Sequence, residues 1–376
     1  MVEPCPLIEI AGPPRERGRL YGRQAAGRIR KGIAHYTEQL AEMSLDQRAV
    51  RDLVARFMPR IADFDPAYAE EIGGIAEGAG IEIEGVALLN ARTEILKLGK
   101  REAEAKAAAT RSPDGCTGVV VMPEAAEAGR LIHAQNWDWK VECAETAVVL
   151  RIRQDHGPDI LTFTEAGGLA RSGFNAAGIA ITANYLESDR DYRDLGVPLA
   201  LIRRKTLEQE HLALAMRTVY ATPKSAANNM IVSHCGGVAI DFECAPDETF
   251  QVHPERGLLV HANHFVSPVA LAKLRDTGIA NTPDSLYRDI RVRDLLAPHI
   301  GRITRETVKV ALADDFAAPW SVCRPPRKNL SNNLSATVAA VIMEPTLGIM
   351  EVAPLPALNR QFTTYRLDMA VRQQAA

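Results

Sequence analysis

The chain has 376 residues, of which 47% are hydrophobic, so it is long enough to bury a large core. Its 44 basic and 47 acidic residues nearly balance, which excludes a general polyanion-binding surface and leaves room only for a local basic patch. No basic stretch followed by an apolar run opens the chain, and no segment is long and apolar enough to cross a membrane. We therefore expect a cytoplasmic protein with no nucleic-acid partner and no membrane partner.

Cysteine and histidine spacing argues against both a disulfide framework and a metal site. The six cysteines are scattered without a CxxC pair, and in a cytoplasmic chain we expect them to be free thiols. His261 and His264 are three residues apart, but no acidic or cysteine partner lies nearby at metal-ligand spacing. The sequence predicts neither a metal nor a cofactor.

The first 110 residues carry apolar side chains at helical intervals. Asp65 followed by Pro66 is typical of a helix start, because a capping side chain is joined to a proline in the first turn. Arg92 and Glu94 on their own would indicate a solvated helix face. Residues 101–111 have no apolar stripe, so we expect an exposed helix end or a flexible linker there. Helices are predicted at residues 25–43, 45–60, 66–78 and 83–98.

From residue 112 onward the pattern changes to strands. Turn residues 112–115 run directly into the β-branched segment 117–121, which predicts a loop feeding a strand. Residues 131–138 form a second strand that can pair with the first. Further strands are predicted at residues 147–152, 160–164, 230–234, 237–243, 249–252, 258–265, 335–344 and 347–352.

Helical segments interrupt these strands. Thr282 can cap one of them, with Pro283 in its opening turn. Alternating β and α blocks with antiparallel hairpins fit an α+β fold, a four-layer αββα sandwich that follows an N-terminal helical prodomain. The helices are predicted at residues 198–216, 223–229, 283–296 and 304–312.

Cys116 stands between Gly115 and Gly118, where the loop becomes a strand. A lone cysteine near a strand is most often a small buried hydrophobe, but these two glycines let other backbone approach closely. If the two strands pair, the thiol at the start of one can face the carboxylate of Asp138 at the end of the other. The two glycines weaken the interpretation as a buried hydrophobe and leave a reactive thiol as the alternative.

Two motifs, Asp114-Gly115-Cys116-Thr117 and Gln135-Asn136-Trp137-Asp138, resemble the acyl-CoA:6-aminopenicillanic acid acyltransferase family. These are the isopenicillin N acyltransferase-like Ntn hydrolases, of peptidase type C45, and residues 88–95 and 258–265 are similar to that family as well. The resemblance implies a zymogen that cleaves itself autocatalytically between Gly115 and Cys116. Cys116 then becomes the N-terminal residue of the larger subunit and supplies the thiol nucleophile.

The implied chemistry agrees with ordinary pKa values. A free thiol has a pKa of about 8.5 and an α-amino group one of about 7.7–8.0, so both titrate near neutral pH. The amine of the same residue lies within reach of the sulfur and can act as the base, so no histidine is required.

The resemblance also implies site residues beyond the nucleophile. Asn263 would donate its side-chain amide to the oxyanion, the alternative being that it caps the following turn. Asp138 would orient the new α-amino group and assist cleavage, the alternative being a structural carboxylate at the strand end. Substrate-binding residues are expected at Thr117, Gln135, Asn175, His264 and Arg324.

The chain departs from the family pattern at one place. Relatives carry a Ser-Arg pair just before the strand at 335–344, whereas Asn333 and Leu334 stand here. Either Arg324 or Arg327 on the nearby Pro-rich loop reaches into the site, or the site lacks this cation. The departure weakens the expectation of a penicillin-type substrate more than that of the nucleophile.

We expect a helical subunit, residues 1–115, and a catalytic subunit, residues 116–376, which stay tightly associated; a homo-oligomer is left open. The expected enzyme is an amidohydrolase or N-acyltransferase that acts on an amide C–N bond of a small molecule through a thioester acyl-enzyme. An acyl-CoA or an amine acceptor is left open as a second substrate. One alternative is a papain-like Cys-His protease, which needs a helix behind the cysteine, and another is a non-catalytic protein that keeps the fold.

Overall fold

Two stacked β-sheets form the centre of the molecule. The structure is a computed structural model that describes residues 3–104, 115–328 and 334–369, so Asn333 and residues 105–111 of the predicted linker lie outside it. Within these ranges one sheet has eight strands in the order β1-β4-β5-β6-β7-β8-β9-β10, and the other has seven in the order β11-β2-β3-β13-β14-β15, with β12 beside β13. The strands are β1 (Leu7–Ile10), β2 (Cys116–Val121), β3 (Ile132–Lys140), β4 (Ala147–Ile152), β5 (Ile160–Glu165), β6 (Ser172–Asn175), β7 (Ile179–Tyr185), β8 (Asn228–His234), β9 (Val238–Cys244), β10 (Thr249–Val252), β11 (Leu258–His261), β12 (Arg327–Lys328), β13 (Leu334–Glu344), β14 (Ile349–Pro354) and β15 (Thr363–Arg366).

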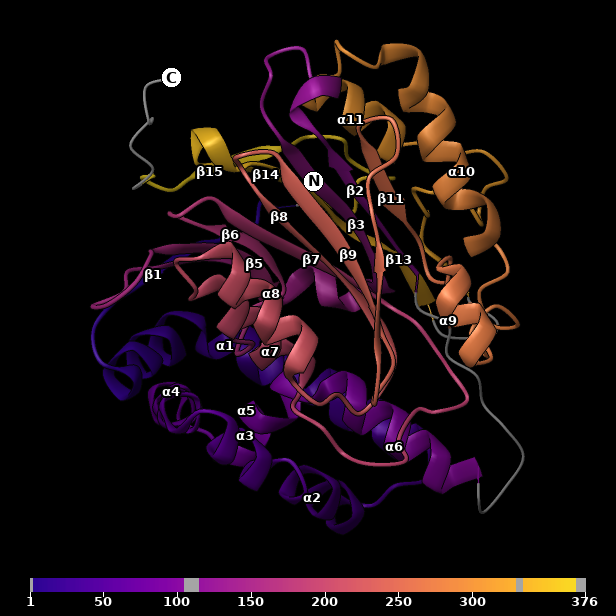
Figure 1. Cartoon of the computed structure of the whole chain (residues 1–376). Coiled ribbons are helices and arrows are strands. Elements are labelled where there is room, and N and C mark those ends of the chain that lie inside the picture. Colours follow the sequence, from indigo (N-terminus) through magenta and orange to yellow (C-terminus); the bar gives the residue numbers. More distant parts are fainter. Residues whose placement is uncertain (1–2, 105–114, 329–333, 370–376) are drawn as a thin grey trace.

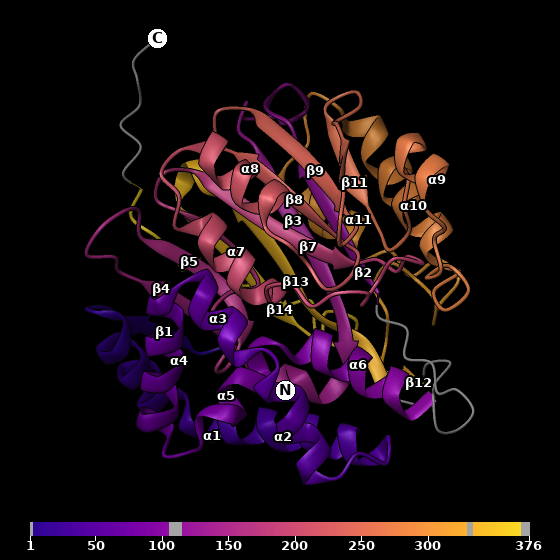
Figure 2. The same cartoon turned by 60° about the horizontal axis from the view of Figure 1, so that its bottom comes forward.

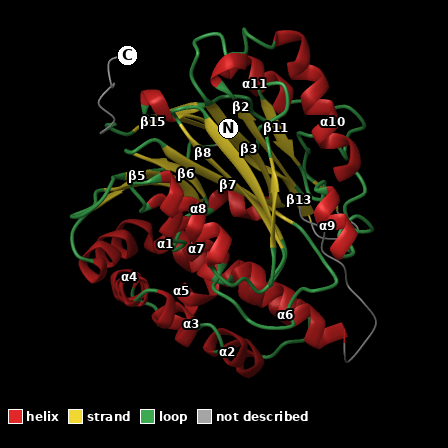
Figure 3. Ribbon diagram, in the orientation of Figure 1, coloured by secondary structure: helices red, strands yellow, loops and turns green. Residues whose placement is uncertain are grey.

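Helices cover the outer faces of both sheets (Figures 1 and 3). Helices α7 and α8 contact strands β6 to β9, and helices α10 and α11 contact β11, β3 and β13, while β2, β3 and β13 of one sheet face β6 and β7 of the other. The order helix, sheet, sheet, helix confirms the predicted αββα sandwich. The helices are α1 (Pro14–Glu42), α2 (Gln47–Ala55), α3 (Met58–Phe64), α4 (Pro66–Ala79), α5 (Ile83–Asn90), α6 (Arg92–Glu104), α7 (Leu199–Leu207), α8 (Leu212–Ala221), α9 (Pro268–Lys273), α10 (Ser285–Leu296) and α11 (Arg305–Leu312).

The inner strands of the sandwich are buried on both faces. All six residues of β2 are buried, as are all nine of β3, because each strand lies inside its sheet and between two layers. Strand β2 accordingly ends in an apolar run, whereas β3 buries five polar side chains whose groups must find partners inside the protein. Between the sheets, the rings of Trp137 on β3 and Phe163 on β5 meet edge to face with centroids 5.7 Å apart.

Helices α1 to α6 lie together at one end of the sandwich (Figures 1 and 2). Helices α1 and α4 approach so closely that a Cβ atom on Gly18 would lie 2.2 Å from the carbonyl oxygen of Glu71, and one on Gly74 would lie 2.1 Å from that of Arg15. The N-terminal part also contributes strand β1, which pairs in parallel with β4. The sequence analysis did not predict this strand. The N-terminal helices and the sandwich are thus built into one structure.

Several helix predictions needed correction. Predicted helix 198–216 is two helices, α7 and α8, and 45–60 and 83–98 are likewise each divided in two. The predicted helix 223–229 is wrong, because residues 228–234 form the buried strand β8 between β7 and β9. Lys224 turns its ammonium back to the carbonyl of Thr222 at 2.7 Å, so this stretch closes α8 instead of opening a new helix.

Other boundaries agree with the sequence. Asp65 caps α4 by accepting the backbone N–H of Ala67 at 3.0 Å, as predicted. Helix α11 begins at Arg305 after the capping residue Thr304. The predicted cap at Thr282 is wrong, because α10 begins at Ser285 and Asp284 precedes it. No helix in the described ranges is long and apolar enough to cross a membrane.

Candidate active site

Cys116 is the first residue of β2 and is 3% exposed. It lies opposite Trp137 of β3, and the next residue, Asp138, donates its backbone N–H to the carbonyl of Gly115 at 2.8 Å. Because side chains alternate along a strand, the thiol shares one face with Trp137 and the Asp138 carboxylate lies on the other. The predicted strand pairing is confirmed, but its register places Asp138 beside Gly115 rather than directly opposite the thiol.

Side chains from distant segments hydrogen-bond to the backbone on the Cys116 side of the Gly115–Cys116 peptide bond. The N–H of Cys116 donates to Oδ1 of Asn263 at 2.7 Å, and the carbonyl of Cys116 accepts from Nη1 of Arg288 at 2.6 Å. A Cβ atom on Gly115 would lie 2.2 Å from Nη1 of Arg324. No residue other than glycine fits at position 115 without moving that guanidinium.

The side-chain amide of Asn263 has a defined orientation. Its Oδ1 also accepts from Nη2 of Arg288 at 2.7 Å, and since a guanidinium only donates, the oxygen must face it. Nδ2 therefore points the other way and donates to the carbonyl of Tyr185 at 2.8 Å. In this structure the amide nitrogen is held at that carbonyl, and donation to an oxyanion stays a prediction.

The loop that carries Asn263 is anchored by a buried carboxylate. Glu243 accepts the backbone N–H groups of Val266 at 2.6 Å and Ser267 at 3.1 Å, and one of its oxygens lies 2.8 Å from Nε2 of His261. Burial lowers the pKa of His261, but the nearby carboxylates of Asp241 and Glu243 outweigh it and raise the pKa to about 9. The predicted strand 258–265 ends at His261 because this loop turns away to meet Glu243.

Asp138 is buried and has two partners. Its Oδ1 accepts from the hydroxyl of Thr337 at 2.7 Å, and its Oδ2 lies 3.3 Å from Nε of Arg324. Burial raises the pKa of Asp138 above its usual range, and the guanidinium groups of Arg324 and Arg288 offset only part of this effect. The carboxyl is therefore easier to protonate than an ordinary aspartate.

The structure answers the question of which arginine reaches the site. Arg324 is buried and pairs with both Asp138 and Asp284. The guanidinium of Arg327 instead stacks on the ring of Trp320, 3.6 Å from its centroid. Arg324 thus supplies the cation that the sequence pattern left open.

A small cavity of about 30 Å³ adjoins the thiol. Nη2 of Arg171 lies 3.8 Å from Sγ of Cys116, and the Arg171 guanidinium lies 4.2 Å from the centroid of the Trp137 ring. The cavity has room for little more than a water molecule. Its lining residues are Arg92, Thr93, Cys116, Trp137, Asp138, Trp139, Arg171, Ala183, Asn184, Tyr185, Leu199 and Arg203.

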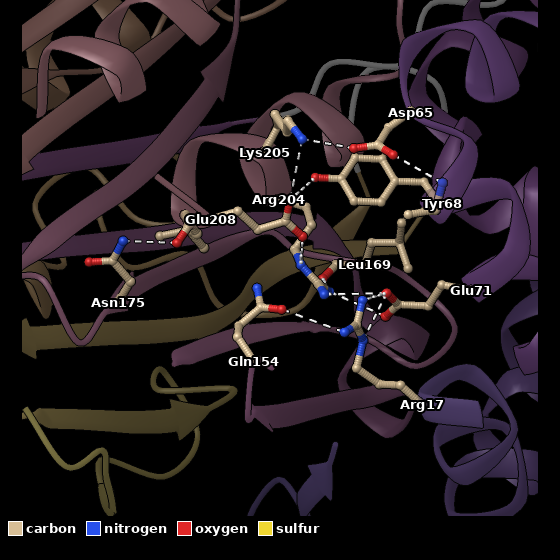
Figure 4. Close-up of polar contacts among 12 residues, drawn as sticks. Arg17, Asp65, Tyr68, Glu71, Gln154, Leu169, Asn175, Arg204, Lys205 and Glu208 are labelled. Carbon is tan, nitrogen blue, oxygen red and sulfur yellow. Dashed lines mark hydrogen bonds and ion pairs between the residues drawn. The ribbon is translucent and has the colours of Figure 1, made fainter. Parts of the chain in front are cut away.

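Four predicted substrate-binding residues have other partners. The hydroxyl of Thr117 accepts from Arg288 at 2.9 Å, Gln135 donates to the carbonyl of Ala183 at 2.7 Å, and Nδ1 of His264 lies 2.8 Å from the hydroxyl of Ser285. Asn175 donates to the backbone carbonyls of Leu207 and Gln209 at the end of α7, both at 2.8 Å, and Figure 4 draws one of these bonds. None of these four residues lines the cavity at Cys116, so contact with substrate has no support from their positions.

The sequence analysis missed or misjudged most of the arginines that surround Cys116. Arg92 and Glu94 are buried, and Arg92 pairs with Glu165 at 2.5 Å, so the interpretation as a solvated face is wrong. Arg171, Arg203 and Arg288 were not singled out. No local signal separated Arg203 from its neighbours, since Arg204 and Lys205 follow it on α7 and Lys205 is partly exposed.

The comparisons with known proteins agree with the geometry. A model of the acyl-coenzyme A:6-aminopenicillanic acid acyl-transferase family matches residues 125–353. The 40 kDa form of the acyl-coenzyme A:6-aminopenicillanic-acid-acyltransferase from Emericella nidulans is 31% identical over 323 residues, which is 84% of each chain. The chain belongs to the acyl-coenzyme A:6-aminopenicillanic acid acyltransferase family.

Solved structures similar to this family member are more distant. Penicillin V acylase from Agrobacterium tumefaciens is 15% identical with a TM-score of 0.45, and the match covers 68% of this chain and 86% of that one. The N-acylethanolamine-hydrolyzing acid amidase ortholog of Caenorhabditis elegans is 16% identical with a TM-score of 0.46, covering 67% and 100%. Membership of the acyltransferase family confirms the predicted family and enzyme class. The papain-like alternative is wrong, because a strand and not a helix begins at Cys116.

Proposed function

We propose that this acyltransferase-family enzyme cleaves its own chain between Gly115 and Cys116, and then uses Cys116 as an N-terminal nucleophile on amide substrates. The observation that carries the proposal is the fixed set of partners around one peptide bond. Asp138, Asn263 and Arg288 each hold a backbone group of residue 115 or 116, at 2.8, 2.7 and 2.6 Å. A cysteine with only a packing role would not need three hydrogen bonds that fix the backbone on both sides of one peptide bond.

Self-cleavage begins with attack of the Cys116 sulfur on the carbonyl carbon of Gly115. A C–S bond forms, the C–N bond breaks, and the thiol proton ends on the nitrogen of Cys116, leaving a thioester. Water then hydrolyses the thioester, which releases the carboxylate of Gly115 and restores the thiol. Negative charge develops on the Gly115 oxygen, where the N–H of Asp138 already donates.

In turnover, the freed α-amino group accepts the thiol proton and the sulfur attacks the carbonyl of a substrate amide. The amine leaves with that proton, and the acyl group remains on Cys116 as a thioester. Water completes hydrolysis, and an amine acceptor completes acyl transfer. Arg171, 3.8 Å from the sulfur, favours the thiolate that attacks.

We assign Asp138 to the new α-amino group, because the carboxylate lies on the face of Gly115 and is held by Thr337 and Arg324. The subunits would then be residues 1–115 and 116–376. The cavity of about 30 Å³ is too small for an amide substrate. We therefore infer that cleavage of the Gly115–Cys116 bond enlarges it.

Processing can be tested by intact-mass spectrometry of the purified protein. We expect two chains, the larger beginning at Cys116, and a single uncut chain for Cys116→Ala. Cys235→Ala is the matched control, since Cys235 is half-buried away from the cavity and should leave cleavage normal. An active preparation that contains only full-length chain would overturn the self-cleavage proposal.

Turnover can be tested with a panel of small amides and a thioester trap. Hydroxylamine added during turnover should convert the acyl-enzyme into a hydroxamate, and adding an amine should divert the acyl group to a new amide. If no acyl group is found on Cys116 during steady-state turnover, the covalent mechanism is wrong.

A further inference from the structure

Two guanidinium groups in the cavity beside Cys116 lack partners that match their charge. Arg203 on α7 is 6% exposed and Arg171 just before β6 is 7% exposed, and both line the cavity. Among the residues that the structure describes, Nε of each is buried without a hydrogen-bond partner, and the Arg203 side chain has no hydrogen bond or ion pair at all.

The carboxylates nearest to this pair are committed elsewhere. Glu165 forms its ion pair with Arg92 at 2.5 Å and accepts the hydroxyl of Tyr36. Glu94 accepts the backbone N–H of Leu199 at 2.9 Å, and burial raises its pKa, which reduces the negative charge it can offer. The cavity is therefore left with more positive than negative charge.

Burial makes this excess charge costly. It lowers the pKa of Arg171 to about 10 and that of Arg203 to about 9, which marks both as poorly compensated cations. The Arg171 guanidinium contacts the ring of Trp137 and the sulfur of Cys116, whereas Arg203 interacts with Cys116 through charge alone. A single thiolate cannot balance two guanidinium groups, so the arrangement requires a further anion.

We propose that Arg171 and Arg203 form an anion subsite, and that the substrate carries a carboxylate close to the amide bond that Cys116 attacks. The planar fork of a guanidinium matches a carboxylate with two parallel hydrogen bonds. Since Arg171 lies 3.8 Å from the sulfur, the carboxylate is separated from the reacting carbonyl by only a few bonds. The subsite rests on the proposed function and adds the substrate class to it.

The carboxylate can belong to the amine part or to the acyl part of the substrate, and paired substrates separate the two. Phenylacetylglycine against phenylacetylglycinamide places the charge on the amine part, and glutaryl-p-nitroanilide against butyryl-p-nitroanilide places it on the acyl part. We expect the processed enzyme to prefer the charged member of one pair by about tenfold or more in kcat/KM.

Arg203→Leu removes the unpaired charge and keeps an apolar side chain on a buried helix. The preference ratio should fall about tenfold, mainly through a higher KM for the charged substrate. The matched control is Lys205→Leu on the same helix, whose ammonium pairs with Asp65 at 2.8 Å, outside the cavity. It should keep the wild-type ratio. An equal ratio in wild type and Arg203→Leu would overturn the subsite.

A second measurement does not depend on turnover. Iodoacetate and iodoacetamide alkylate the same thiol and differ in one carboxylate. The ratio of their rates at Cys116, followed by mass spectrometry of the processed protein, should be about tenfold higher in wild type than in Arg203→Leu. If no amide is hydrolysed and this ratio still falls, the proposed function fails and the subsite stands. If amides are hydrolysed and neither ratio changes, the subsite fails alone.

Discussion

At the scale of single residues, the site is a set of hydrogen-bond donors and acceptors around one peptide bond. Arg288 contacts the carbonyl of Cys116, the hydroxyl of Thr117 and Oδ1 of Asn263, so one side chain fixes three groups. Asp284 in turn pairs with Arg288 and Arg324. These contacts fix the backbone at Cys116 before any substrate binds, which is what a preorganised site requires.

Asp138→Asn keeps the shape of the side chain and removes its charge. We expect self-cleavage and turnover to slow by about 100-fold, as for loss of a positioned acid or base. A nearby carboxylate favours the ammonium form, so its loss should lower the pKa of the α-amino group and move that limb of the pH–rate profile to lower pH. Normal processing and an unchanged profile would rule the role out. Thr337→Val removes the hydroxyl that donates to Asp138 and accepts the backbone N–H of Arg324, but it keeps the carboxylate and should leave that limb in place.

Asn263→Ala tests the oxyanion assignment. If the amide donates to the tetrahedral intermediate, kcat should fall by about 100- to 1,000-fold with a much smaller change in KM. The same variant removes the acceptor of the Cys116 N–H, so processing should also slow. A near-normal kcat in cleaved Asn263→Ala protein would contradict the oxyanion assignment. Asn263 would then only hold the loop through its hydrogen bond to the Tyr185 carbonyl.

At the scale of elements, helices α1 and α4 are joined by glycines on both sides of their contact. Gly18 and Gly22 on α1 face the backbone of α4, and Gly74 and Gly78 on α4 face the backbone of α1. Glycines four residues apart lie on the same helix face, so each helix presents a smooth strip to the other. The packing of the N-terminal helices depends on these small residues.

Gly74→Ala and Gly73→Ala form a matched pair on α4. A methyl group at position 74 would lie 2.1 Å from the carbonyl oxygen of Arg15, so the helices must separate and the free energy of unfolding should fall by about 3 kcal/mol. At position 73 the nearest atom is 3.8 Å away, so alanine should be neutral or raise stability by up to about 1 kcal/mol through its helix propensity. Urea unfolding followed by circular dichroism measures both, and equal effects would contradict the close packing.

At the scale of the whole molecule, buried contacts join the two proposed subunits, residues 1–115 and 116–376. Glu71 on α4 is fully buried between Arg17 of the N-terminal part and Arg204 on α7 (Figure 4). Strand β1 adds a further link by pairing with β4 of the larger part. A cut at Gly115 leaves these contacts intact.

We therefore expect the two chains to co-purify after cleavage and to separate only on unfolding. Glu71→Ala would leave the buried Arg17 without a carboxylate and Arg204 with Glu208 alone, and it should cost about 3–5 kcal/mol of stability. Glu77 is the control on the same helix, because it also pairs with arginines of α1 but at the surface, and Glu77→Ala should change stability little. Size-exclusion chromatography in increasing denaturant measures dissociation. Equal midpoints for the two variants would contradict the buried link.

The sequence by itself determined the features that depend on neighbouring residues. The cap at Asp65, the strand that starts at Cys116, its pairing with 131–138 and the resemblance to the family were read from neighbouring residues, and the structure or the comparisons confirmed them. Turn residues next to β-branched runs, and a proline after a capping residue, restrict the backbone wherever they occur.

Only the tertiary structure decided which long side chains reach the thiol. Arg171 and Arg203 come from segments distant from Cys116, so no local pattern places them there, and the fold also decided between Arg324 and Arg327. The helix predicted at residues 223–229 was wrong for a related reason, because pairing of β8 with β7 overrides the local helix preference. The nucleophile could be found from the sequence, but the charge around it required the fold, because burial and pairing are set by distant segments.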